Sequence, residues 1–138
     1  LVDGLQAHRG MTMAVRVEAL DPLPEYLLLY ELYLQVHDNG ASERMGLPMQ
    51  LRHRGRSPAG SHLYVAVFDE DQVHLYRDGT RYSSFTRAMP WDQLSDLAQL
   101  KLLQPSRHHD NPDDLPRLIY RDLWLFDRAL SEAELSRL

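Results

Sequence analysis

The chain has 138 residues, a length that suits one domain with one hydrophobic core. Hydrophobic residues make up 43% of it and charged residues 25%, so burial of apolar surface can offset the entropy of ordering the chain. The formal net charge of -5 argues against a nucleic-acid-binding surface, because phosphates are neutralised by clustered Lys and Arg. The absence of cysteine excludes disulfides, thiolate metal sites and cysteine nucleophiles.

The longest continuous apolar run, Tyr26 to Tyr30, is far shorter than the roughly 20 residues that a membrane-spanning helix needs. We therefore predict no membrane insertion. No signal peptide is visible, and the start at Leu1 rather than Met indicates a processed or trimmed chain.

Short segments separated by turn signals are typical of an all-β sandwich or barrel. Met11 to Leu20 alternates partly between apolar and polar side chains, which predicts a strand buried on one face. Asp21-Pro22-Leu23-Pro24 ends it, because two prolines remove hydrogen-bond donors. Glu25 to Val36 is apolar on nearly every side, and a buried helix would also fit. Its aromatic content and the following turn signal, Asp38-Asn39-Gly40, favour a strand.

The clearest pair of strands is Leu63 to Phe68 and Val73 to Arg77, joined by Asp69-Glu70-Asp71-Gln72. Asp78-Gly79 then supplies a two-residue type I′ turn, because this dipeptide tolerates positive φ at both positions. Thr80 to Thr86 returns as a third strand, so the sequence predicts an antiparallel meander.

The rest of the chain predicts two more strands and a short helix. Leu97 to Leu103 can form a strand, and Gln104 to Pro116, which is polar and carries three prolines, should be a surface loop. Leu118 to Phe126 is the final strand. Ser131 is followed three residues later by Glu134, which matches a capping box, so the helix should begin at Ser131.

Three motifs follow one another in the second half of the chain: Tyr64-Val65-Ala66-Val67-Phe68-Asp69, Val73-His74-Leu75-Tyr76-Arg77-Asp78-Gly79, and Arg121 to Leu135. Together they resemble laminin-G-like and pentraxin-like domains of the concanavalin A-like superfamily. The good match runs from Leu63 onward. It implies an all-β, antiparallel two-sheet jelly-roll β-sandwich with a short C-terminal helical turn, as one domain over residues 1–138.

This sequence departs from the family pattern in two places. The family usually has a strand before the one that starts here at Met11, and only ten residues precede it. We therefore expect either a fragment of a larger protein that lacks a first strand or an abbreviated sandwich. The glycine that usually precedes the closing strand is also missing near Leu118.

The resemblance implies binding sites at the sandwich rim or on its concave face, some of which hold calcium through six to eight hard oxygen ligands. The best acidic loop for calcium contains Asp110, Asn111, Asp113 and Asp114. A solvated loop with turn-forming Asp and Asn is the commoner explanation of such a composition.

Ligand contact is expected at Asp69 and Asp71 in the hairpin connection and at Trp91 in a loop led by proline. Solvation of a hairpin explains the two aspartates equally well, and packing is the favoured explanation of Trp91. Trp124 lies inside the closing strand, where we expect it to pack within the sandwich or under the terminal helix.

The seven histidines indicate a transition-metal site only weakly. His108 and His109 are adjacent and point to opposite sides of an extended chain, and no third ligand is identifiable. His53, His62 and His74 could approach one another only if their strands are neighbours and their faces agree. His74 is more simply a strand residue on the face that carries Tyr76.

Catalytic motifs of the superfamily are absent. Its glucanases place their carboxylates on one strand in a Glu-x-Asp-x-x-Glu motif that this sequence lacks, and no serine sits in a nucleophile elbow. We therefore predict a non-enzymatic binding or adhesion module that recognises carbohydrate or protein through rim loops and is secreted, periplasmic or on the cell surface. The alternatives are a structural domain that docks onto a larger polypeptide and, third, a glucanase-like glycoside hydrolase.

Calcium binding by the acidic loop has a direct thermal signature. Excess calcium should raise the melting temperature and a chelator should reverse the rise, because a ligand selective for the folded state stabilises it. Replacing Asp113 and Asp114 with Asn should remove the effect. If neither calcium nor chelator changes the melting temperature of the unsubstituted chain, the prediction is contradicted.

Overall fold

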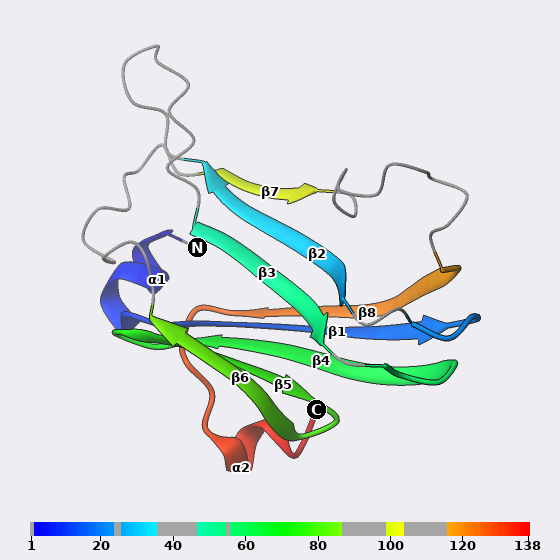
Figure 1. Cartoon of the computed structure of the whole chain (residues 1–138). Coiled ribbons are helices and arrows are strands. Elements are labelled where there is room, and N and C mark those ends of the chain that lie inside the picture. The colour runs from blue at the N-terminus through cyan, green and yellow to red at the C-terminus, as the bar shows by residue number, and fades with distance from the viewer. Residues whose placement is uncertain (1, 24–25, 36–46, 55, 87–98, 104–115) are drawn as a thin grey trace.

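The computed structural model of this chain describes residues 2–23, 26–35, 47–54, 56–86, 99–103 and 116–138. In chain order its elements are α1 (Val2–His8), β1 (Met11–Ala19), β2 (Tyr26–Gln35), β3 (Leu47–Arg54), β4 (Gly60–Phe68), β5 (Gln72–Arg77), β6 (Thr80–Thr86), β7 (Gln99–Leu103), β8 (Leu118–Phe126) and α2 (Glu132–Leu135) (Figure 1). The predicted all-β class is confirmed. Within these ranges, no helix is long and apolar enough to cross a membrane.

The strands form two antiparallel sheets. The larger has the order β6-β5-β4-β1-β8 and the smaller the order β3-β2-β7. Figure 1 shows the smaller sheet on one side of the larger sheet and α2 on the opposite side. The ambiguous segment is therefore a strand, β2, and it lies at the centre of the smaller sheet. The jelly-roll connectivity of a closed sandwich stays a prediction.

One face of the larger sheet, here called the Met13 face, is buried along β1 and along the second half of β4. Met13 and Val15 of β1 lie opposite Ala66 and Tyr64 of β4, and all four are at most 1% exposed. Figure 1 shows the smaller sheet on one side of this larger sheet. The predicted alternation along β1 is confirmed, since these are its odd-numbered apolar residues.

The other face, here called the Thr12 face, is buried along the first half of β1 only, so the expectation that β1 is buried on one face was wrong for that half and holds for the second half. Thr12 and Ala14 are both 0% exposed. Ala14 and Val65 pack in one cluster with Leu130 and Leu135 from the C-terminal segment. This segment covers the first half of β1 on the Thr12 face, whereas Arg16 and Glu18 further along the same face are partly exposed.

Trp124 also packs against this cluster from β8, as expected of a residue under the terminal helix. The Arg16 guanidinium carbon lies 5.9 Å from the centroid of its ring, within the range of a cation–π contact. Trp124 is therefore part of the packing on the Thr12 face.

The β4-β5-β6 meander is confirmed, including its type I′ turn. Asp78 and Gly79 have φ angles of 48° and 78°, as this turn requires. Further along the hairpin the register shifts, because Leu75 pairs with Ser83 while Tyr76 pairs with Arg81. Tyr82 is thus the extra residue of a β-bulge.

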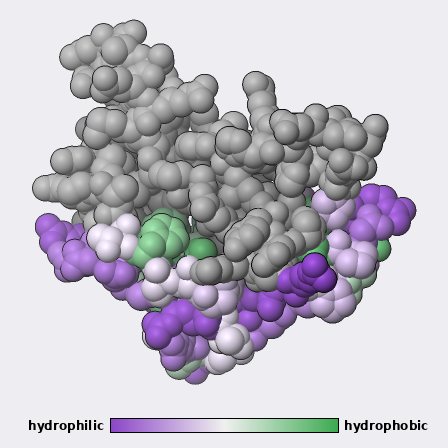
Figure 2. All heavy atoms as spheres, in the orientation of Figure 1, coloured by the Kyte–Doolittle hydropathy of each residue, from purple (hydrophilic) through white to green (hydrophobic). Residues whose placement is uncertain are grey.

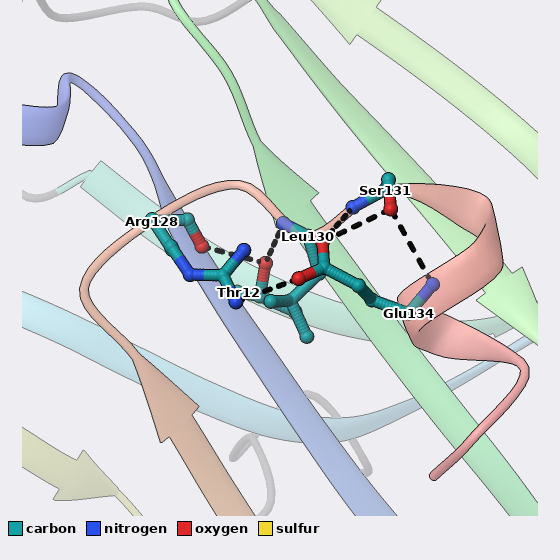
Figure 3. Close-up of polar contacts among 5 residues, drawn as sticks. All are labelled: Thr12, Arg128, Leu130, Ser131 and Glu134. Carbon is teal, nitrogen blue, oxygen red and sulfur yellow. Dashed lines mark hydrogen bonds and ion pairs between the residues drawn. The ribbon is translucent and has the colours of Figure 1, made fainter.

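A single buried hydroxyl ties the C-terminal segment to β1. Thr12 Oγ1 donates a hydrogen bond to the carbonyl oxygen of Arg128 and accepts one from the amide of Leu130, each 2.9 Å long (Figure 3). Gly10 permits this close approach, because a Cβ at that position would lie 2.6 Å from the amide nitrogen of Ala129. The turn after β8 is therefore fixed by both a polar contact and a steric one.

The predicted capping box at Ser131 is confirmed. The Glu134 amide donates to Ser131 Oγ at 3.4 Å, and the Ser131 amide donates to Glu134 Oε2 at 2.9 Å (Figure 3). Arg128 donates to the other carboxylate oxygen of Glu134 at 2.7 Å. These bonds, led by the one from Arg128, lower the pKa of Glu134 to about 2.

Replacing Thr12 with Val should destabilise the fold by about 2 kcal/mol, because the Leu130 amide and the Arg128 carbonyl lose their partner while side-chain volume is kept. Thr12→Ser keeps the hydroxyl and loses one methyl group, so it should cost about 1 kcal/mol. Urea unfolding measures both. A Val variant as stable as the Ser variant would show that the hydroxyl contributes little.

Glu134 should make stability depend on acid. Its pKa is about 2 in the folded chain against an ordinary value of 4.5, so its contribution is complete above pH 4.5 and is lost as the pH falls through about 2. Glu134→Gln should melt at a lower temperature than the unsubstituted chain at pH 7, and the difference should shrink toward pH 2. A difference that stays constant in thermal melts over this range would contradict the role of the carboxylate.

Candidate functional site

Two chains of hydrogen bonds, each running from a carboxylate through a histidine to a serine, lie at opposite ends of β5. We call Asp69, His74 and Ser84 the Asp69 network, and Asp78, His62 and Ser57 the Asp78 network. The first lies at the turn between β4 and β5, and the second at the turn between β5 and β6. Neither network was predicted from the sequence.

Asp69 organises the turn that follows β4. Its Oδ1 atom accepts hydrogen bonds from the amides of Gln72 at 2.7 Å and Asp71 at 3.1 Å, and its own amide donates to the Gln72 carbonyl at 3.0 Å. Burial alone would raise the pKa of Asp69, but the hydrogen bonds from these amides and from His74 leave it below its usual value. Asp69 is therefore a carboxylate at neutral pH.

The Asp69 network extends across the hairpin to β6. His74 Nε2 lies 3.1 Å from Asp69 Oδ2, and His74 Nδ1 lies 2.8 Å from Ser84 Oγ. The imidazole is about one-fifth exposed, and Ser84 is exposed. The network thus ends on a hydroxyl that solvent can reach.

Acidic, basic and aromatic side chains lie at the same end of the sheet as this network. Arg9, which has a φ of 45° at the end of α1, forms an ion pair with Glu70. Asp71 is exposed. Phe85 follows Ser84 on β6 and so lies on the opposite, Met13 face, where it is 43% exposed. Together with Asp69 they form what we call the β4–β5 rim, defined by Arg9, Asp69, Glu70, Asp71, His74, Ser84 and Phe85.

The Asp78 network has the same composition but a different setting. His62 Nδ1 lies 2.7 Å from Asp78 Oδ2, and His62 Nε2 lies 3.2 Å from Ser57 Oγ. The Leu63 amide donates to Asp78 Oδ1 at 2.9 Å. Because Ser57 is only 5% exposed, this network braces the hairpin and presents no hydroxyl to solvent.

The structure separates two of the histidines considered as metal ligands. His62 lies opposite Val17 on the Met13 face, whereas His74 lies opposite Val67 on the Thr12 face. They cannot share one ion, and His74 does lie on the face that carries Tyr76, as predicted. In the part of the chain that the structure describes, no group of three or more metal-ligating side chains is assembled.

Of the predicted site residues, Asp69 and Asp71 lie together at the β4–β5 rim. Trp91 and the acidic loop residues Asp110, Asn111, Asp113 and Asp114 fall outside the described ranges. Ligand contact at Trp91 and calcium binding by that loop therefore stay predictions. His74, Ser84 and Phe85 are the rim residues that the sequence reasoning missed.

Three carboxylates with shifted pKa values are shifted downward. Hydrogen bonds from the Arg117 side chain and amide lower the pKa of Asp21 to about 2, Glu134 also has a pKa of about 2, and that of Asp69 is lowered. A general acid of glycoside hydrolysis needs a raised pKa so that it carries a proton at neutral pH. These three side chains do not fit that role.

No protein-family model matches this chain, and no curated protein matches it. Solved structures of the Trypanosoma rangeli sialidase do match. Its complex with sialic acid has a TM-score of 0.55 at 17% identity over 94% of this chain. Its covalent intermediate with 2,3-difluorosialic acid has a TM-score of 0.55 at 16% identity over 95% of this chain.

A mutant of the same sialidase that displays trans-sialidase activity matches with a TM-score of 0.52 at 19% identity over 94% of this chain. In all three comparisons the match spans 22% of the sialidase chain. At these identities the likeness concerns the fold alone, and this chain therefore has the all-β fold of one part of these sialidases.

Proposed function

We propose that this chain is a carbohydrate-binding module of the concanavalin A-like, jelly-roll type, without catalysis of its own, in a secreted, periplasmic or cell-surface protein. The observation that carries the proposal is the fold shared over 94% of this chain with part of an enzyme solved in complex with sialic acid. The match spans 22% of that enzyme, which supports an accessory role for the matched part.

The β4–β5 rim is the proposed ligand site. Sugar recognition combines an aromatic face with polar groups held in fixed positions. Ser84, whose hydroxyl is held by His74, is exposed on one face of the edge strand β6, and Phe85 offers an exposed ring on the other face. A ligand that contacts both must reach around this edge. Asp71 adds an exposed carboxylate that can accept hydrogen bonds from sugar hydroxyls.

The proposed lack of catalysis is supported by how the described carboxylates are used. Asp21 and Glu18 are paired with Arg117 and Arg121, and Asp69 is held by two amides and His74. Each of these carboxylates serves a structural contact. A glucanase-like activity is therefore the least supported of the three candidate functions.

Docking onto another part of a larger protein is the second candidate, and one observation favours it. Leu123 and Tyr120 on the edge strand β8 are 39% and 38% exposed. However, Figure 2 shows one face of the molecule, on which the described surface is mostly hydrophilic with only small hydrophobic areas. A docking module is expected to present a larger continuous apolar patch, so carbohydrate binding is the better supported function.

Replacing Phe85 with Ala should weaken binding of the preferred glycan about fivefold, because a stacked aromatic face contributes about 1 kcal/mol. Titration calorimetry with a panel of neutral and sialylated oligosaccharides measures the affinity. Leu123→Ala is the matched control, since Leu123 is about as exposed as Phe85 but lies on the opposite edge strand of the same sheet. Its affinity should be unchanged.

The two variants also distinguish the candidates. Equal loss of affinity in both variants would place the ligand elsewhere than the rim. A panel that is blank for the unsubstituted chain at high protein concentration would contradict carbohydrate binding and leave docking as the better candidate.

A further inference from the structure

The hydrogen-bond pattern of the Asp69 network determines which ring nitrogen of His74 carries the proton. Asp69 is a carboxylate at neutral pH, because hydrogen bonds lower its pKa in spite of burial, and a carboxylate only accepts hydrogen bonds. Its Oδ1 atom already accepts from two amides, and its Oδ2 atom faces His74 Nε2 at 3.1 Å. His74 Nε2 must therefore be the donor.

This tautomer in turn determines what Ser84 offers to a ligand. A neutral imidazole with its proton on Nε2 has a bare Nδ1, which can only accept. Ser84 Oγ lies 2.8 Å from that nitrogen, so the Ser84 hydroxyl must donate its proton to His74. Ser84 then faces solvent with its lone pairs alone, and it can only accept a hydrogen bond from a ligand.

We propose that the protonation state of His74 sets the hydrogen-bond polarity of Ser84 at the rim. With neutral His74, Ser84 accepts from a ligand hydroxyl. When His74 takes up a proton, Nδ1 becomes a donor, the Ser84 hydroxyl rotates to accept from it, and its own proton is released toward the ligand. The ligand partner then changes from a donor, such as a sugar hydroxyl, to an acceptor, such as a carboxylate or an amide carbonyl.

The reversal breaks neither bond of the network, because a hydroxyl can donate or accept. The inference rests on the proposed function only for the nature of the ligand. Histidine is the side chain that proteins generally use to sense a change between neutral and mildly acidic pH. The rim would thus select different ligand groups in neutral and acidic surroundings.

Charged groups reach this part of the molecule from each element around His74. The β4–β5 turn contributes Asp69, Glu70 and Asp71, and Arg9 follows α1. Burial first, and then the charges of Glu132 on α2, Arg81 on β6 and Asp69, act on the neighbouring Tyr76, whose pKa is raised. The direction of the reversal is determined by the two hydrogen bonds of His74.

The Asp78 network is a control within the same molecule, because His62 is attached the other way round. Its Nδ1 faces the carboxylate of Asp78 and its Nε2 faces Ser57. The same reasoning assigns His62 the opposite tautomer, with the proton on Nδ1. Since Ser57 is 5% exposed, this second network should leave ligand binding unaffected.

Nitrogen NMR of the histidine rings decides the inference. In long-range proton–nitrogen spectra at pH 7.5, His74 should show a protonated Nε2 and a bare Nδ1, and His62 should show the reverse. Ser84→Ala should keep the His74 tautomer, because Asp69 determines it. A protonated Nδ1 on neutral His74, or rapid averaging between its two tautomers, would overturn the proposal.

The glycan panel at pH 7.5 and pH 5.5 tests the consequence for binding. The affinity of a bound glycan should change about fivefold between the two pH values, as expected for one hydrogen bond, and the change should vanish in Ser84→Ala. The same pH dependence with and without the Ser84 hydroxyl would count against the proposal. A blank panel at both pH values would contradict the proposed function, while the ring-nitrogen spectra would still decide the polarity of Ser84.

Discussion

A buried hydroxyl group holds the C-terminal segment of this chain against its central strand. Thr12 lies in β1, between β4 and β8, and it bonds both the carbonyl of Arg128 and the amide of Leu130. Those contacts fix Leu130, which together with Leu135 covers the apolar residues of the Thr12 face. One polar contact thereby positions a second hydrophobic layer, and the first half of β1 is buried on both faces as a result.

Much of the fold could be predicted because its signals are local. The type I′ turn at Asp78-Gly79, the bounds of β8 and the capping box at Ser131 all follow from residues within a few positions of one another. The burial of Thr12 and Ala14 could not be predicted this way, because the Leu130 that covers them is far away in sequence. Helix α1 was also missed, since Val2–His8 carries no strong capping signal.

The Asp69 network was missed for a different reason. A hairpin with a two-residue turn at Asp78-Gly79 and an unbroken register would place His74 opposite Ser83. The bulge at Tyr82 shifts the pairing by one residue, and His74 then lies opposite Ser84. A β-bulge has no reliable sequence signal here, yet it decides which serine completes the network and which side chains the rim presents.

The position of β1 in the sheet also has a consequence for how the chain acquires its structure. One edge of β1 pairs with β4 and the other with β8. Synthesis of β8 is complete only when more than a hundred residues have been added after β1. Until then the backbone groups along one edge of the central strand and the apolar residues of the Thr12 face have no partner. Such high contact order is typical of slow folding and of transient aggregation-prone intermediates. During synthesis the edge of β1 therefore stays unpaired until β8 is made. A chaperone that shields β1 over that interval would protect the nascent chain from aggregation.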